Sequence, residues 1–202
     1  FTFFSSFGQS FFLGLFNSSI REALSISHGQ FGTIYASATL LSSFILIWLG
    51  KKIDEVDIFK FASLVAILLS LSCFFFSKIS SITFLFFAIF LMRFSGQGMM
   101  SHTATTTVSR YFTKSRGKAL STIWFGLSSA EFILPVFTIF LLTITDWRNI
   151  WIIISILVIL FLPLISFILI KKLNFESREI SNDLSTKNLN IKSWKRAEVF
   201  KD

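Results

Sequence analysis

The chain has 202 residues, of which 53% are hydrophobic and only 15% are charged, and its formal net charge is +8. A water-soluble core of this length could not bury 28 phenylalanines together with long runs of Ile and Leu, so the composition predicts a protein whose solvent is lipid. The cations lie in short clusters between apolar runs and form no single basic face, so we expect no nucleic-acid partner.

Six apolar runs are long enough to span a bilayer as helices, which takes roughly 20 residues, if tilt and a shortened first run are allowed. The chain opens directly at Phe1 without an initiator Met or a basic leader, so we expect a fragment whose first helix is clipped. The predicted spans are Phe1–Phe16, Phe31–Leu49, Ile58–Phe76, Ile82–Val108, Ala119–Ile144 and Ile150–Ile170.

The composition changes after Ile170 to Lys, Asn, Ser and Glu, which is typical of a linker. We therefore expect an all-α, six-helix transmembrane bundle over residues 1–171 and a cytoplasmic linker over residues 172–202. The linker ends in a mixture of cations and apolar residues from Ser193 onward, which predicts a short amphipathic segment.

The Lys and Arg residues are distributed unevenly between the two ends of the predicted spans. Fifteen of the 19 lie between the second and third spans or in the first turn of the third, between the fourth and fifth, or after the sixth, whereas Arg21, Lys78 and Arg148 lie at the opposite ends. Cations in short loops stay on the cytoplasmic side, so the N-terminus and residues 172–202 are predicted to be cytoplasmic. We expect the membrane to be the inner (plasma) membrane of a bacterium.

The fourth span carries the most polar stretch within any predicted helix. A cation at mid-bilayer costs at least about 2.5 kcal/mol on insertion scales, so we expect Arg93 to face a hydrated cavity or a partner. Arg93, Gln97 and Ser101 recur every four residues and share one helix face, which we expect to line a solute path. The alternative is that Arg93 only joins two helices through a fixed polar contact, as Gly96 and Gly98 would by close packing.

Glu131 is the only carboxylate well inside a predicted span. Along ideal helices, Arg93 lies roughly 16 Å from the outer end of the fourth span and Glu131 roughly 18 Å from the inner end of the fifth, so their depths nearly coincide. A pair between them is one expectation, and a carboxylate that is at times unpaired and dry suits proton coupling. A permanent structural pair would instead leave nothing to titrate.

Polar residues in the first two spans are further candidates for the solute path, although each would also serve as a bond between neighbouring helices: Gln9, Tyr35 and Thr39. Pro135 in the fifth span removes a backbone donor and is a candidate for a gating bend. No His or Cys has a second ligand at a useful spacing, so we expect neither a metal site nor a cofactor.

Two loops and the fourth span carry motifs of a known family. Gly50 and Asp54 stand four residues apart between the second and third spans, and Arg116 is followed by Gly117 in the basic connection after the fourth span. With the run from Arg93 to Gly98, these motifs resemble the N-terminal half of the major facilitator superfamily (MFS). The resemblance covers essentially the whole chain.

The sequence departs from the family pattern directly after Asp54. The family places Arg, Gly and further cations there, whereas this chain has Glu55, Val56 and Asp57. The departure puts the family's charge relay in this loop in doubt.

The resemblance implies a transporter of twelve helices in two halves, each built of 3+3 inverted repeats, which rock around a cavity at the midplane. It implies that a C-terminal half is missing and would begin after Asp202. We therefore expect a secondary active transporter, a symporter or antiporter and not an enzyme, that moves a small solute by alternating access. Expected partners are the bilayer, the solute, a proton or other coupling ion, and the missing half.

The planar donors of Arg93 favour an organic anion over other small polar solutes. The alternative function is a non-transporting membrane scaffold or receptor-like helix bundle, in which a pair between Arg93 and Glu131 would be purely structural.

Overall fold

The structure, a computed structural model, describes residues 1–112 and 115–184. The chain divides into two units, residues 1–170 and residues 171–202, each of which is treated by itself. All regular elements in the described residues are helical, so the predicted all-α membrane bundle is confirmed, with six as an approximate number of helices. Five segments are long and apolar enough to cross a membrane: His28–Ile53, Ile58–Ser77, Ile82–Tyr111, Arg116–Ile144 and Trp147–Ile168.

The first predicted span, Phe1–Phe16, is not one helix but three short helical pieces. These are α1 (Thr2–Ser5), the 3-10 helix η1 (Ser6–Gly8) and α2 (Ser10–Gly14). The break falls at Gln9, whose extended backbone, with ψ of 154°, interrupts the helical hydrogen bonds. A further helix, α3 (Asn17–Leu24), follows and ends at Ser25, which has a left-handed backbone with φ of 52°.

The next two long helices begin at polar caps. α4 (His28–Leu49) starts with a capping box in which Ser27 and Gln30 satisfy each other's backbone N–H groups. A short 3-10 helix, η2 (Gly50–Asp54), follows α4. α5 (Ile58–Ser77) begins where the Asp57 carboxylate accepts from two backbone N–H groups of the first turn.

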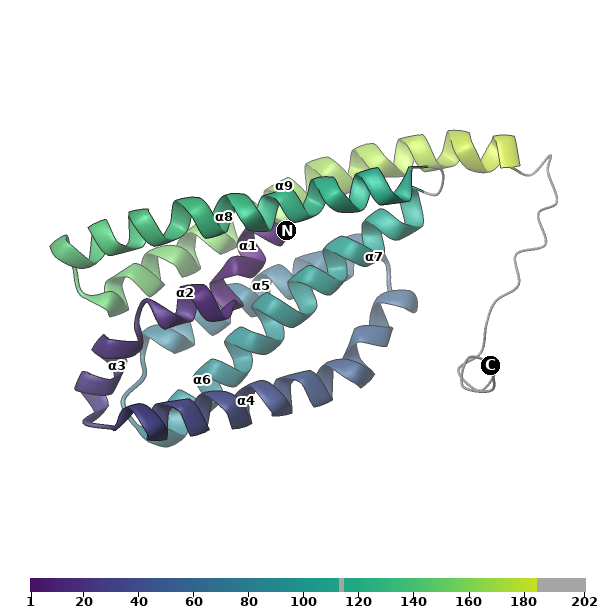
Figure 1. The fold of residues 1–202 in the computed structure, drawn as a ribbon. Helices are drawn as coiled ribbons and strands as arrows, with labels where there is room; N and C mark the ends of the chain where they lie inside the picture. Colours follow the sequence, from purple (N-terminus) through teal and green to yellow (C-terminus); the bar gives the residue numbers. More distant parts are fainter. Residues whose placement is uncertain (113–114, 185–202) are drawn as a thin grey trace. The chain divides into compact units, whose positions relative to one another are not determined.

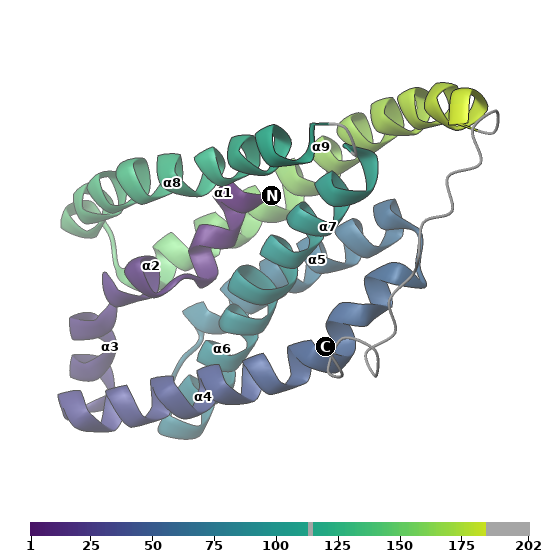
Figure 2. The same ribbon diagram turned by 45° about the vertical axis from the view of Figure 1, so that its right-hand side comes forward.

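The fourth predicted span is one continuous helical rod made of three segments. It begins with α6 (Ile82–Met92), capped by Ser81, passes through the π-helix η3 (Arg93–Met100) and ends with α7 (Ser101–Tyr111). Figures 1 and 2 show the three segments following one another along a single axis. The π-helical middle coincides with the polar stretch that the sequence singles out.

The last two helices are the longest ones described. α8 (Arg116–Ile144) continues through Pro135, and α9 (Trp147–Leu184) begins where the Asp146 carboxylate accepts from the N–H of Arg148. Residues 171–184 of α9 belong to the second unit, so the part of the predicted linker that the structure describes is helical. The amphipathic segment predicted from Ser193 lies outside the described residues.

Within residues 1–170, the rod of α6, η3 and α7 runs between two groups of helices. α4 packs against α6 and η3 on one side, α1 packs against both η3 and α8 on the other, and α5 contacts α6 and η3. Both ribbon views show α1 and α2 between α8 and this rod (Figures 1 and 2). The broken first span therefore lies directly on the π-helical segment.

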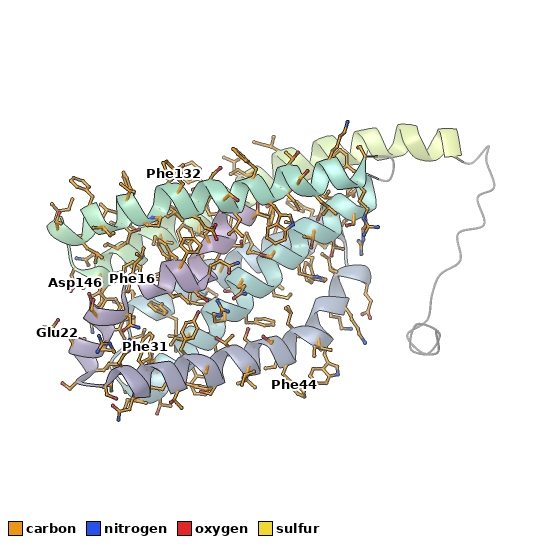
Figure 3. The ribbon with its side chains drawn as sticks, viewed as in Figure 1. Phe16, Glu22, Phe31, Phe44, Phe132 and Asp146 are labelled. Atoms are coloured by element: carbon orange, nitrogen blue, oxygen red, sulfur yellow. The ribbon has the colours of Figure 1, made fainter. Side chains whose placement is uncertain are left out.

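The outer faces of this unit are apolar, as expected for helices in lipid. Phe44 of α4 and Phe132 of α8 project away from the bundle (Figure 3) and are 60% and 81% exposed. Phe16 and Phe31, by contrast, are buried between the helices. Exposed phenylalanines on outer faces would be a liability in water but are ordinary in a bilayer.

An aromatic cluster and a pair of serines fix α9 to the rest of the unit. Trp151 is fully buried, and its ring contacts Phe12, Phe16 and Phe76 at centroid distances of 5.5, 5.0 and 4.4 Å. Close by in sequence, the hydroxyl of Ser155 donates to the carbonyl of Ser70 at 2.8 Å. Contacts of both kinds hold membrane helices together where no hydrophobic driving force acts between them.

Candidate solute-binding cavity

A small cavity lies between α4 and the π-helical segment η3. Its volume is about 160 Å³, below the roughly 300–1,000 Å³ of sites for drug-sized ligands. Five of its seven lining residues are polar although the cavity lies in an apolar bundle, and none of them is an acid. The lining residues are Thr39, Ser42, Ser43 and Leu46 from α4 and Arg93, Gln97 and Gly98 from η3.

The π-helix places the polar side chains of η3 on the cavity. A π-turn inserts one extra residue into a helix and re-aims the side chains that follow, which is why such turns are frequent at functional sites. Here it begins at Arg93 and ends at Met100, and both Arg93 and Gln97 line the cavity. The predicted polar face of the fourth span therefore starts where the helix changes its winding.

Arg93 is buried, with 7% of its surface exposed, and it contacts the broken first span. Its Nη1 donates to the carbonyl of Gly8 at 3.0 Å and to the hydroxyl of Ser10 at 3.2 Å. The guanidinium also lies 5.4 Å from the ring centroid of Tyr35, whose hydroxyl donates to Ser10 at 2.9 Å. One edge of the guanidinium is thereby held in place by α2, α4 and the carbonyl freed at the break.

Two glycines explain how the first span comes so close to η3. A Cβ on Gly96 would lie 2.7 Å from both the Cα and the backbone nitrogen of Gly8, a separation that real side chains do not reach. The two backbones are in direct contact at this point, which only glycine allows. Gly98 faces Leu46 of α4 under a milder restriction, since its Cβ would lie 3.1 Å from that side chain.

Several polar atoms around the cavity have no hydrogen-bond partner. The Nε of Arg93 and the hydroxyl of Thr39 are buried and unpaired, and both residues line the cavity. The hydroxyl of Ser101, one turn beyond Gln97, is also buried and unpaired. Leaving such groups unsatisfied is costly, so each of them is a candidate for contact with a bound solute or water.

The structure brings together part of the predicted path and leaves other members outside it. Arg93, Gln97 and Thr39 line the cavity, and Tyr35 contacts Arg93 from α4. Ser101 does not line the cavity, although it lies on the same rod. Gln9 is half-buried at the break in the first span, and no contact joins its side chain to the cavity.

Glu131 does not pair with Arg93. It lies exposed on α8, and the ion pair within the described residues joins Lys52 to Glu55 at 2.6 Å. Similar depth along two helices does not fix the direction in which each side chain points, which is why the expected pair is absent. Pro135, one turn further along the same helix, is half-buried.

The loop that begins at Gly50 is bound to α7 through its backbone. His102 Nε2 donates to the carbonyl of Gly50 at 2.8 Å, since a carbonyl oxygen can only accept. Arg110 likewise donates to the carbonyl of Ile53 at 2.9 Å. Arg116 and Gly117 begin α8 and are exposed. The structure describes no side-chain position for Asp54.

Sequence reasoning missed Ser42 and Ser43 of the cavity and the carbonyl of Gly8 that holds Arg93. Both serines stand three and four residues after Thr39, so helical periodicity would have placed them on its face. The role of Gly8 comes from the approach of two distant segments, for which the sequence carries no local signal. Among the described residues, no cluster of three His, Cys, Asp or Glu residues could hold a metal.

An apolar bundle with five candidate spans, a polar stretch inside one of them and a small cavity beside a buried arginine defines a helical membrane protein of the transporter class. The sequence profile of the Major Facilitator Superfamily matches residues 1–199. The chain therefore belongs to this superfamily of membrane transporters. No curated protein and no solved structure matches it significantly.

Proposed function

We propose that this chain forms the N-terminal half of a secondary transporter that moves a small polar or organic-anion solute by alternating access. The observation that carries the proposal is the polar cavity between α4 and η3, where buried Arg93 keeps an unpaired Nε. A purely structural arginine in a membrane helix would be expected to satisfy all its donors within the protein. A second six-helix half, as the family has, would complete the cavity.

Cysteine accessibility tests the hydrated path directly. Gln97→Cys should react with a membrane-impermeant maleimide in the full-length protein, and the reactive side of the membrane should change when the solute gradient is reversed. Ile89→Cys is the matched control because Ile89 lies about two turns before Gln97 on the same rod and is 1% exposed. If neither cysteine were labelled, the result would favour the alternative of a dry, non-transporting bundle. The hydrogen bonds of Arg93 to Gly8 and Ser10 are the structural observation that favours this alternative.

Proton coupling through Glu131 is the second part of the proposal. Glu131 is the only acidic residue within the five candidate spans, and it has no ion pair among the described residues. An ionisable residue within a membrane span is a candidate for a functional role by default. Glu131→Gln should abolish accumulation driven by a pH gradient, whereas Glu22→Gln, on the short helix α3, should leave it unchanged. Normal proton-driven accumulation by Glu131→Gln would end the coupling hypothesis.

We further propose that the N-terminus and residues 172–202 face the cytoplasm of a bacterium, on the basis of the cation distribution. The loop that begins at Gly50 and the start of α8 would then lie on the same side. Reporter fusions after Gly50 and after Lys78 should give opposite locations, and equal locations would contradict this orientation.

A further inference from the structure

The wide turns of η3 lie against the first span at Gly8. A Cβ on Gly8 would meet the carbonyl oxygen of Met92 and would lie 2.5 Å from the backbone nitrogen of Gln97. Met92 and Gln97 are five residues apart, which is the spacing of the hydrogen bonds that define a π-helix. The backbone of Gly8 therefore lies directly on a wide turn, where there is no room for a side chain.

The start of η3 is fixed to its neighbours by hydrogen bonds. Arg93 donates to the carbonyl of Gly8 at 3.0 Å, and Ser95 donates to the hydroxyl of Ser72 on α5 at 3.0 Å. α6, which leads into η3, is also firmly packed, because three large side chains among its eleven residues are buried: Leu85, Ile89 and Met92. A change of winding in η3 would therefore leave α6 in place.

α7, which follows η3, is packed less firmly. Of its eleven residues, Thr103 and Ala104 are the buried ones, and both side chains are small. Ser101, the first residue of α7, has a buried hydroxyl without a hydrogen-bond partner, which is costly in this position. Turning α7 about its axis would expose little apolar surface and would give this hydroxyl a new environment.

Rewinding of η3 as an α-helix would turn α7 in this way. A π-turn holds one residue more than an α-turn, so rewinding advances the following helix by about one residue, which is about 100° of rotation and about 1.5 Å of translation. Gly96 and Gly98 give η3 the backbone freedom for such a change. Met99 and Met100, at its end, have flexible side chains that repack easily.

We propose that η3 is a conformational switch: the first span holds it in the π form through Gly8, and withdrawal of the first span lets it rewind as an α-helix and turn α7. His102 and Arg110 of α7 would then leave their acceptors. These acceptors are the carbonyls of Gly50 and Ile53, at 2.8 and 2.9 Å. Movement of the first span is thereby coupled to release of the loop that begins at Gly50. The inference goes beyond the proposed function, since it requires neither a particular solute nor a coupling ion.

Distances between two spin labels in the full-length protein test this switch without any solute. One label is placed on α7 at Thr106 and the other on the outer face of α4 at Phe44, after Cys73 and any other cysteine have been replaced by Ala. Gly8→Ala should push the first span off η3 and shift the main distance by about 5 Å, because a turn of about 100° carries a side chain of α7 at least that far. Gly14→Ala is the matched control in the same span, since nothing lies within 4 Å of its Cβ, and it should leave the distance unchanged.

Deletion of Gly98 distinguishes a change of winding from a simple displacement of α7. Removing one residue from η3 takes up the extra residue of the wide turn, so η3 should be α-helical whether or not the first span touches it. The deletion variant should fold with α7 in its original direction, and adding Gly8→Ala should cause no further shift. Deletion of Ile67 from the regular helix α5 is the control, because it turns half of that helix out of register by about 100° and should prevent folding.

Three results would overturn the proposal. These are an unchanged label distance in Gly8→Ala, an equal shift by Gly8→Ala with and without Gly98, and a deletion of Gly98 that is as damaging as the deletion of Ile67. If Gly8→Ala does not fold, the unsubstituted first span decides the matter. Its distance distribution should then contain a second peak about 5 Å from the first that disappears on deletion of Gly98, and identical distributions would contradict the switch.

Discussion

Two consecutive segments of one rod, α6 and η3, differ in how they are accommodated in a membrane. α6 is a regular α-helix with one polar side chain, Thr83, in eleven residues. η3 follows without interruption, is π-helical, and carries Arg93, Gln97 and two glycines. The difference shows that the polar residues are tolerated where another backbone comes close enough to supply acceptors and a cavity takes up the remaining donors.

The largest expected effect in this comparison concerns the backbone contact between Gly96 of η3 and Gly8 of the first span. Gly96→Ala should lower the free energy of unfolding by about 3 kcal/mol, because its Cβ would overlap Gly8 and force η3 away from the first span. The measurement is thermal or denaturant unfolding in micelles. Gly32→Ala on α4 is the control, since nothing lies within 4 Å of its Cβ, and it should change stability by less than about 1 kcal/mol. Equal stability of both variants would contradict a direct backbone contact.

The second test places a polar side chain in α6 and removes one from η3. Ile89→Gln places an amide among the buried residues of α6, where no partner is available, and should cost about 2–3 kcal/mol of stability. Gln97→Leu removes an amide from the half-buried cavity wall and should cost less than about 1 kcal/mol while altering solute binding. Unfolding measured side by side on the two variants checks the prediction. If they lost stability equally, η3 would not be the more polar environment.

The smallest expected effect concerns the attachment of η3 to α5. Ser95 is fully buried and donates to the hydroxyl of Ser72 at 3.0 Å, so Ser95→Ala should cost about 1 kcal/mol. Ser129→Ala on α8 removes only a bond to its own helix, at Phe125, and should have an effect near zero. Unfolding of the double variant Ser72→Ala/Ser95→Ala should show less than the sum of the single losses, and strict additivity would argue against the bond.

The long helices could be predicted from the sequence because hydropathy and caps are local signals. Asp57 and Ser81, for example, stand directly before helices whose predicted starts at Ile58 and Ile82 the structure reproduces. The break at Gln9 was not predicted, because Gly8 directly before it is only a weak local signal and the contact between Gly8 and Gly96 is made by residues far apart in sequence.

Part of the candidate site could be predicted from the sequence, because polar side chains inside a membrane span are energetically costly and therefore conspicuous. That cost singled out Arg93 and Gln97, and both line the cavity. The cost of polarity could not show which neighbour Arg93 contacts, because depth along two helices says nothing about rotation around their axes. Glu131 lies at the expected depth on α8 but is exposed. Ser42 and Ser43 were overlooked because serines are common along this helix and become informative only through their spacing from Thr39.

The indole of Trp151 gives the molecule an optical reporter of its own. Its Nε1 is buried and unpaired and its ring touches phenylalanines of the first span, so its fluorescence originates from a dry, aromatic cage. Emission at short wavelength would indicate that the first span is packed against Trp151 of α9. A conformational change that separates the first span from α9 would shift the emission toward longer wavelength. With the other four tryptophans, Trp48, Trp124, Trp147 and Trp194, replaced by Phe, that shift could be followed in real time during solute addition.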